Sequence, residues 1–88
     1  MIQKEVEIRN RLGLHARAAA KFVRCASGFD CEIQVGKDAM TVNGKSIIGV
    51  LLLAAPQGSR ITVIADGSDE EEAMAALARL VADRFGEE

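Results

Sequence analysis

The sequence predicts an α+β fold in which a four-stranded antiparallel sheet has three helices on one face. Three observations favour this fold. Alternating apolar and polar residues indicate four short strands, and apolar residues at helical spacing indicate three helices. Along the 88 residues these elements follow the order β-α-β-β-α-β-α, with no repeat or linker. Charged and amide side chains alternate outward on the strands, so we expect the second face of the sheet to be solvated.

The chain is expected to begin with a strand over residues 2–9, where apolar and polar side chains alternate. After a loop at residues 10–13 the spacing changes, and apolar residues three and four positions apart predict an amphipathic helix. The apolar stripe of this helix consists of Ala19, Phe22, Val23 and Ala26. Its second, basic face consists of Arg17, Lys21 and Arg24. Gly28 follows the helix and is placed for a left-handed cap.

A hairpin is predicted after this helix. Its first strand alternates apolar and polar residues over 31–35, a turn follows at residues 36–38, and Met40 and Val42 indicate the second strand. Ser46 then precedes an apolar run, as a helix N-cap does, and predicts a short helix over residues 47–53.

The last two predicted elements are a strand and a helix. Residues 61–65 are mostly β-branched and apolar, which is typical of a strand. Ser68, with Glu71 three residues later, has the spacing of a capping box and predicts the start of the last helix. The buried stripe of this helix and its flank are expected to contain Ala73, Met74, Leu77, Leu80, Val81 and Arg84.

Length and composition limit the function. A chain of 88 residues is expected to form one domain, residues 1–88, and a net charge of −2 does not suggest a nucleic-acid partner. Cys25 and Cys31 are expected to be buried thiols, not a disulfide or a metal site. The first residues do not resemble an export signal, and no apolar stretch is long enough for membrane insertion, so a cytoplasmic location is expected.

His15, the only histidine, lies between a predicted loop and a predicted helix. The first amides of a helix have no partners within it, so those of Ala16, Arg17 and Ala18 are candidates to bind an anion. The Arg17 guanidinium is suited to phosphate oxygens, and the positive environment favours a neutral, nucleophilic imidazole. The arrangement therefore suits a phosphorylated histidine. A surface histidine that merely caps the helix would explain the same residues.

The segment Gly13-Leu14-His15-Ala16-Arg17 resembles the active-site motif of the HPr family. Its members are histidine-phosphorylated carriers of the phosphoenolpyruvate-dependent phosphotransferase system. Residues 43–50 resemble the motif around the family's regulatory serine, and residues 58–70 resemble its last strand and turn. The resemblance covers nearly the whole chain and implies an open-faced β-sandwich of β-α-β-β-α-β-α order.

The resemblance also implies roles for individual residues. His15 would accept the phosphoryl group on Nδ1, and Arg17 would stabilise that group. Ser46 would be the site that a dedicated HPr kinase/phosphorylase modifies in many bacteria, although helix capping alone also explains this serine. The family's docking surface for its partners corresponds to Arg24, Ile47, Ile48 and Leu51.

The implied function is a covalent relay, not the activity of a free-standing enzyme. Phosphorylated enzyme I would donate the phosphoryl group and a IIA-type protein would receive it. The resemblance implies a monomer without a cofactor or a metal. Two other functions remain open: a carrier in a regulatory, nitrogen-type branch without a sugar permease, and an interaction module without chemistry.

Two positions depart from the family's pattern. Ala18 stands where proline is common, but both residues fit the first turn of a helix, and alanine restores one amide near the anion site. Leu12 stands where many members have a small polar residue able to hold the imidazole. The group that orients His15 is therefore not evident from the sequence.

Overall fold

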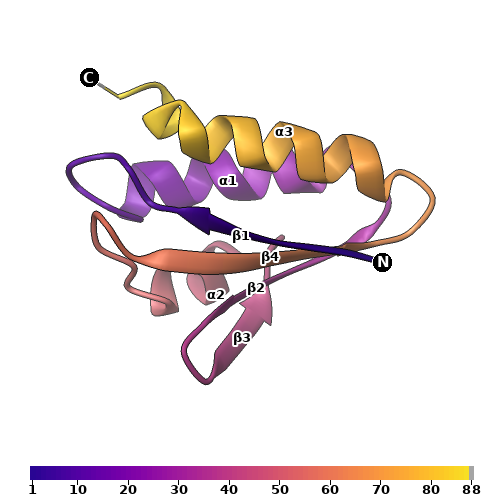
Figure 1. Ribbon diagram of the computed structural model, residues 1–88, viewed down its shortest axis with the longest axis horizontal. Coiled ribbons are helices and arrows are strands. Elements are labelled where there is room, and N and C mark those ends of the chain that lie inside the picture. The colour runs from indigo at the N-terminus through magenta and orange to yellow at the C-terminus, as the bar shows by residue number, and fades with distance from the viewer. Residues whose placement is uncertain (88) are drawn as a thin grey trace.

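The computed structural model describes residues 1–87 and confirms the predicted fold class and element order (Figure 1). Its strands are β1 (Ile2–Glu7), β2 (Glu32–Lys37), β3 (Met40–Asn43) and β4 (Arg60–Asp66). Its helices are α1 (Ala16–Ser27), α2 (Ile47–Leu52) and α3 (Glu70–Ala82), followed by the 3₁₀ turn η1 (Arg84–Gly86).

The sheet has the strand order β1-β4-β2-β3, and every pair in it is antiparallel. The central strand β4 therefore joins the N-terminal strand to the β2–β3 hairpin. Val63 of β4, for example, lies between Lys4 of β1 and Val35 of β2. Helices α1 and α3 lie side by side over one face, as Figure 1 shows. The opposite face exposes Glu5, Glu32, Gln34 and other polar residues, as predicted.

The core lies between the sheet and the helices, as the apolar patterns predicted. In α1 the buried residues include Ala19, Phe22 and Ala26, whereas Val23 is only half-buried. In α3 the buried residues are Ala73, Met74, Leu77 and Val81. Arg84 lies beyond α3 and is exposed, so its predicted place beside the buried stripe is wrong.

The predicted left-handed cap after α1 and the predicted start of α3 are also wrong. Gly28 has a right-handed backbone (φ −76°), and its N–H closes the last turn of α1 on the Cys25 carbonyl at 3.2 Å. The helix α3 begins at Glu70, two residues after the predicted cap. Asp69 at its N-cap uses its carboxylate to accept hydrogen bonds from the Asp30 and Cys31 amides, at 2.8 and 2.9 Å. Tying α3 to the start of β2 thus takes precedence over a capping box.

The two cysteines are free thiols, as predicted. Cys31 is buried, as predicted, whereas Cys25 is only half-buried. Burial raises the pKa of both thiols. Within residues 1–87, none of the helices has the length and hydropathy needed to cross a bilayer.

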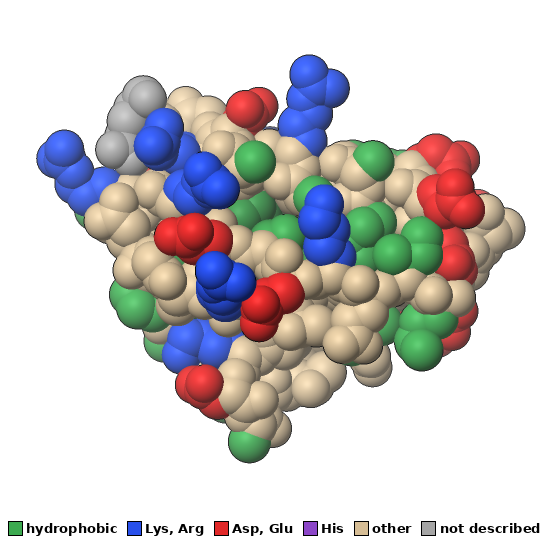
Figure 2. Space-filling view, viewed as in Figure 1, with side chains coloured by type: hydrophobic (Ala, Val, Ile, Leu, Met, Phe, Trp, Pro, Cys, Tyr) green, Lys and Arg blue, Asp and Glu red, His purple; other side chains and the backbone are tan. Residues whose placement is uncertain are grey.

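Charge is unevenly distributed over the surface. Figure 2 shows acidic side chains gathered at the end of the molecule where α3 begins, while several Lys and Arg side chains lie toward the opposite end. The acidic end includes Glu70, Glu71 and Glu72 in the first turn of α3, where they interact favourably with the helix dipole. The opposite end contains the loop that precedes α1 and the turn that follows α3 (Figure 1).

Candidate functional site

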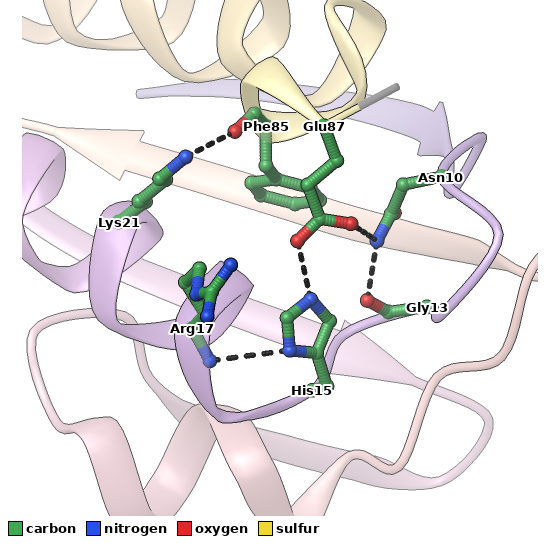
Figure 3. A network of polar contacts seen from close by, with 7 residues as sticks. All are labelled: Asn10, Gly13, His15, Arg17, Lys21, Phe85 and Glu87. Atoms are coloured by element: carbon green, nitrogen blue, oxygen red, sulfur yellow. Dashed lines mark hydrogen bonds and ion pairs between the residues drawn. The ribbon is translucent and has the colours of Figure 1, made fainter.

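His15 occupies the N-cap position of α1, with an extended backbone (φ −78°, ψ −179°). Its Nδ1 accepts a hydrogen bond from the Arg17 backbone N–H at 3.3 Å, and its carbonyl accepts one from the Ala19 N–H at 2.8 Å. The imidazole therefore lies over the first turn of α1 with Nδ1 turned toward the helix backbone (Figure 3).

The loop before His15 is fixed by its packing against residues 55 and 56. Gly13 has a left-handed backbone (φ +70°), and a Cβ there would lie 2.6 Å from the Ala55 carbonyl oxygen. Only glycine fits such a close approach. The next residue, Leu14, is buried and donates its N–H to the same carbonyl at 2.8 Å. These contacts set the direction from which His15 enters the helix.

A carboxylate that the sequence analysis missed contacts the imidazole. Glu87 Oε2 is hydrogen-bonded to Nε2 of His15, and Glu87 Oε1 accepts a hydrogen bond from Asn10 Nδ2 at 3.1 Å (Figure 3). An ionised carboxylate can only accept, so this contact assigns the hydrogen of a neutral imidazole to Nε2. Nδ1 then keeps its lone pair. Residues 15 and 87 are 72 positions apart, and no local pattern signals such a contact.

Glu87 reaches the site because the chain turns back after α3. Arg84, Phe85 and Gly86 have φ values of +57°, +55° and +75°, a left-handed conformation that is unfavourable for the first two. The Phe85 side chain is buried in the core, and this burial offsets the backbone cost. Lys21 Nζ also donates a hydrogen bond to the Phe85 carbonyl at 2.6 Å, which holds the turn against α1.

The surroundings of Glu87 favour its ionised form. Burial, the largest single influence, raises the pKa of this carboxyl. The hydrogen bonds from His15 and Asn10, with the charge of Lys21 and that of His15 in its protonated form, together outweigh burial, and the pKa lies below its ordinary value. Glu87 is therefore a carboxylate at neutral pH, as the assignment of the imidazole hydrogen requires.

Arg17 provides a cation close to Nδ1. Its side chain is exposed in the first turn of α1, and its guanidinium has no hydrogen-bond or ion-pair partner among residues 1–87. A cation at this end of a helix is opposed by the helix dipole, so stability does not account for the position. The neighbouring Ala16 is exposed, whereas Ala18 is fully buried. The backbone amides of these three residues belong to the first turn, whose N–H groups lack partners four residues earlier.

A cleft of about 600 Å³ lies between the loop before α1, helix α1 and the C-terminal turn. It is lined by Arg11, Leu12, Arg17, Lys21, Gly86 and Glu87. Half of these residues are cationic, so the cleft suits an anionic group. Leu12 has a relative exposure of 69%, and its apolar side chain offers no hydrogen bond to the ring. Among the described residues it is Glu87 that holds Nε2.

A second group of predicted residues lies on and beside α2. Ser46 caps this helix, because its Oγ accepts a hydrogen bond from the Gly49 N–H at 3.2 Å. Ile47 and Ile48 have relative exposures of 41% and 69%, whereas Leu51 is half-buried. Arg24 is exposed on α1, which packs against α2. We use the term α2 surface for Arg24, Ile47, Ile48 and Leu51.

The chain is similar to known proteins over nearly its whole length. A family model described as "PTS HPr component phosphorylation site" matches residues 2–83. The phosphocarrier protein HPr of Neisseria meningitidis serogroup A is 51% identical over 87 residues, which cover 99% of this chain and 98% of that protein. The crystal structure of HPr-C-His from Thermoanaerobacter tengcongensis has 49% identity and a TM-score of 0.96, covering 100% of this chain and 99% of that one. A crystal structure described as an HPr dimer from the same organism has 48% identity and a TM-score of 0.80, covering 99% and 100%.

Proposed function

Because this chain belongs to the HPr family of phosphocarrier proteins, we propose that it accepts a phosphoryl group from phosphorylated enzyme I on Nδ1 of His15 and passes it to a IIA-type protein. A member of this family is a phosphocarrier and not a catalytic enzyme. One observation supports Nδ1 as the atom that accepts the phosphoryl group. Nε2 of His15 is bonded to the Glu87 carboxylate, while Nδ1 faces the first turn of α1.

The transfer follows from this geometry. The Nδ1 lone pair gives up the hydrogen bond that it accepts from the Arg17 N–H and attacks the phosphorus of the donor. The bond from phosphorus to the donor breaks, and the electron pair of that bond returns to the donor. The phosphoryl group then lies where the amides of Ala16, Arg17 and Ala18 and the Arg17 guanidinium can stabilise its charge. Glu87 stays on the far side of the ring and balances the positive charge that develops on the imidazole.

The proposal is tested by incubating the protein with phosphoenolpyruvate and enzyme I. Intact mass should show one added phosphoryl group, and its bond should be acid-labile. Nitrogen-15 NMR of the imidazole should place the group on Nδ1. A protein that binds its partners without gaining phosphate would instead be an interaction module, and phosphate on Nε2 would contradict the proposed geometry.

We propose that partners dock on the α2 surface, beside helix α1, which His15 caps. An apolar centre with a charged rim is typical of transient interfaces, and Ile47 and Ile48 with Arg24 match it. Exposed apolar side chains that lie together commonly mark such surfaces.

Ile48→Glu should weaken binding to enzyme I by about tenfold or more, because a charge must then be desolvated at the centre of the contact. The melting temperature should stay close to that of the wild type, since Ile48 is largely exposed. Met40→Glu is a matched control, because Met40 is an exposed apolar residue on β3, outside the α2 surface. Equal affinities for the two variants, measured by calorimetry, would argue against this docking surface.

We propose further that phosphorylation of Ser46 inhibits the relay by adding charge to the α2 surface. A phosphate would bring roughly −1.5 to −2 charges at pH 7. At the N-terminus of α2 that charge is compatible with the fold. Ser46 directly precedes Ile47 and Ile48, however, so a docked partner would have to desolvate the new dianion.

Ser46→Asp should therefore reproduce part of the inhibition. We expect an unchanged melting temperature and a weaker apparent affinity in phosphotransfer from enzyme I at varied carrier concentration. Ser46→Asn is the matched control, since asparagine also caps helices well but carries no charge. If Asp and Asn variants transfer equally well at low concentration, the serine is only a helix cap.

We also propose that residues 1–88 form a single HPr-like domain that works as a monomer in the cytoplasm. The two free thiols fit a reducing compartment. A similar chain from Thermoanaerobacter tengcongensis is described as a dimer, so sedimentation equilibrium at the concentrations used for phosphotransfer is the direct measurement.

A further inference from the structure

Asn10 is a fully buried polar residue in the loop before His15. Its side-chain amide uses both hydrogens: Nδ2 donates to the Gly13 carbonyl at 2.6 Å and to Glu87 Oε1 at 3.1 Å. In Figure 3 the amide lies beside Glu87, on the side away from Arg17, and does not reach the imidazole. Of residues 10–13, the other polar side chain, that of Arg11, is exposed.

We propose that Asn10 is a positioning residue for phosphoryl transfer, which acts through Glu87 to hold the imidazole of His15 with Nδ1 unprotonated over the first turn of α1. Its effect on transfer rests on the proposed function. The positioning of the ring itself is a property of the unphosphorylated protein.

The Glu87 carboxylate bridges the two side chains. Oε1 accepts from Asn10 and Oε2 is bonded to Nε2 of His15, so both oxygens are used. A carboxylate attached to the ring alone could rotate about its side-chain bonds. The second bond, to an amide held by Gly13, restricts that rotation. Asn10 thus connects the ring to the loop that enters α1, although its own atoms do not touch the ring.

The buried side-chain oxygen of Asn10 reduces the stability of the fold, which argues that this residue has a function. Asn10 Oδ1 is buried and has no hydrogen-bond partner among residues 1–87. Rotating the amide by half a turn would not help, because Oδ1 would then face two acceptors, the Gly13 carbonyl and the Glu87 carboxylate. A buried acceptor without a partner destabilises a fold, and such groups in native proteins are uncommon. Selection for stability alone does not account for an amide here, whereas orientation of Glu87 does.

The hydrogen bond between Asn10 and Glu87 also depends on the C-terminal turn. Phe85 is buried and Lys21 holds its carbonyl, so the turn positions the Glu87 backbone without help from Asn10. The role left to Asn10 is to direct the Glu87 side chain. We therefore expect replacement of Asn10 to affect the ring more than the path of the C-terminus.

A double-mutant cycle tests whether Asn10 acts on the His15 imidazole through Glu87. The wild type, Asn10→Ala, Glu87→Ala and the double variant are compared by nitrogen-15 NMR of the imidazole before phosphorylation, and by the single-turnover rate of phosphotransfer from saturating enzyme I. We expect each single variant to increase the population with hydrogen on Nδ1, and to slow transfer by roughly tenfold or more. In the Glu87→Ala background, Asn10→Ala should cause no further change in either measurement. Asn43→Ala is the matched control, because Asn43 also hydrogen-bonds a neighbouring backbone group but lies on β3, away from the site.

Asn10→Ser controls for a folding defect, because it keeps a polar group in the loop. Its hydroxyl oxygen lies one bond nearer the main chain than Nδ2, so the longer bond to Glu87 (3.1 Å) is lost before the shorter bond to the Gly13 carbonyl (2.6 Å). The variant should therefore behave like Asn10→Ala at the imidazole. Independent, additive effects of Asn10 and Glu87 would overturn the proposal, as would an unchanged imidazole spectrum in Glu87→Ala. A changed spectrum in a protein that never accepts phosphate would support the positioning and contradict the proposed function.

Discussion

Replacing His15 with alanine is expected to abolish phosphoryl acceptance while the protein stays folded. His15 is the only histidine in the chain, so no other imidazole can substitute for it. Loss of its N-cap bond to the Arg17 amide should reduce the free energy of unfolding by about 1 kcal/mol. The fold tolerates a loss of that size, because domains of this kind are typically stable by roughly 5–15 kcal/mol.

His15→Asn separates the chemical role from the structural one. Asparagine is a good N-cap, so this variant should be at least as stable as His15→Ala, yet it has no nucleophilic ring nitrogen. Intact mass after incubation with enzyme I and phosphoenolpyruvate should show no added phosphoryl group in either variant. Phosphorylation of one of them at the wild-type level would mean that another residue is the acceptor.

The elements that the sequence predicted correctly depend on local periodicity. Strand β4 and helix α1 each bury one face, and that face is visible in the spacing of residues such as Ile61 and Val63, or Ala19 and Phe22. The Ser46 cap was equally local, because its partner Gly49 is three residues away. Where a structural feature depends only on residues close together in the chain, residue spacing is sufficient to predict it.

The wrong predictions share a different cause. The capping-box spacing at Ser68 was local, but the Asp69 carboxylate bonds to amides 38 and 39 residues away in the chain. The helix therefore has Asp69 instead of Ser68 at its N-cap and begins one residue later than the capping box predicts. Similarly, Gly28 lies where a left-handed cap is common, but the chain continues directly into the Asp30–Asp69 contact with a right-handed turn.

The residues of the candidate site also divide into those that local sequence predicts and those that it does not. His15 and Arg17 could be singled out, because a histidine and an arginine at a helix start are adjacent in sequence. Glu87 and Asn10 could not, since the contacts of Glu87 with Asn10 and with the ring join the two ends of the chain. Leu12 left the question of what orients the imidazole. The C-terminal turn answers it through the left-handed residues Arg84 and Phe85, a conformation that sequence spacing does not indicate.

Arg17→Ala is expected to slow phosphotransfer strongly and to leave stability unchanged or slightly improved. The Arg17 guanidinium has no partner among the described residues, and the helix dipole opposes its charge, so the fold loses nothing with it. A charge-assisted hydrogen bond to a phosphoryl oxygen is worth about 1.5–3 kcal/mol. If that bond forms in the transition state, its loss corresponds to a decrease of roughly 10- to 150-fold in rate.

Two further variants serve as comparisons for the phosphotransfer rate of Arg17→Ala. Arg79→Ala removes an exposed arginine from α3 and should transfer at the wild-type rate, which controls for the loss of one surface charge. Arg17→Lys keeps the charge but not the planar, forked donors, so it should recover only part of the rate. Single-turnover transfer to His15 and from it should be affected alike, because the same phosphoryl group lies beside Arg17 in both directions. Wild-type rates in Arg17→Ala would reduce Arg17 to a surface charge and leave the backbone amides of α1 as the stabilising groups.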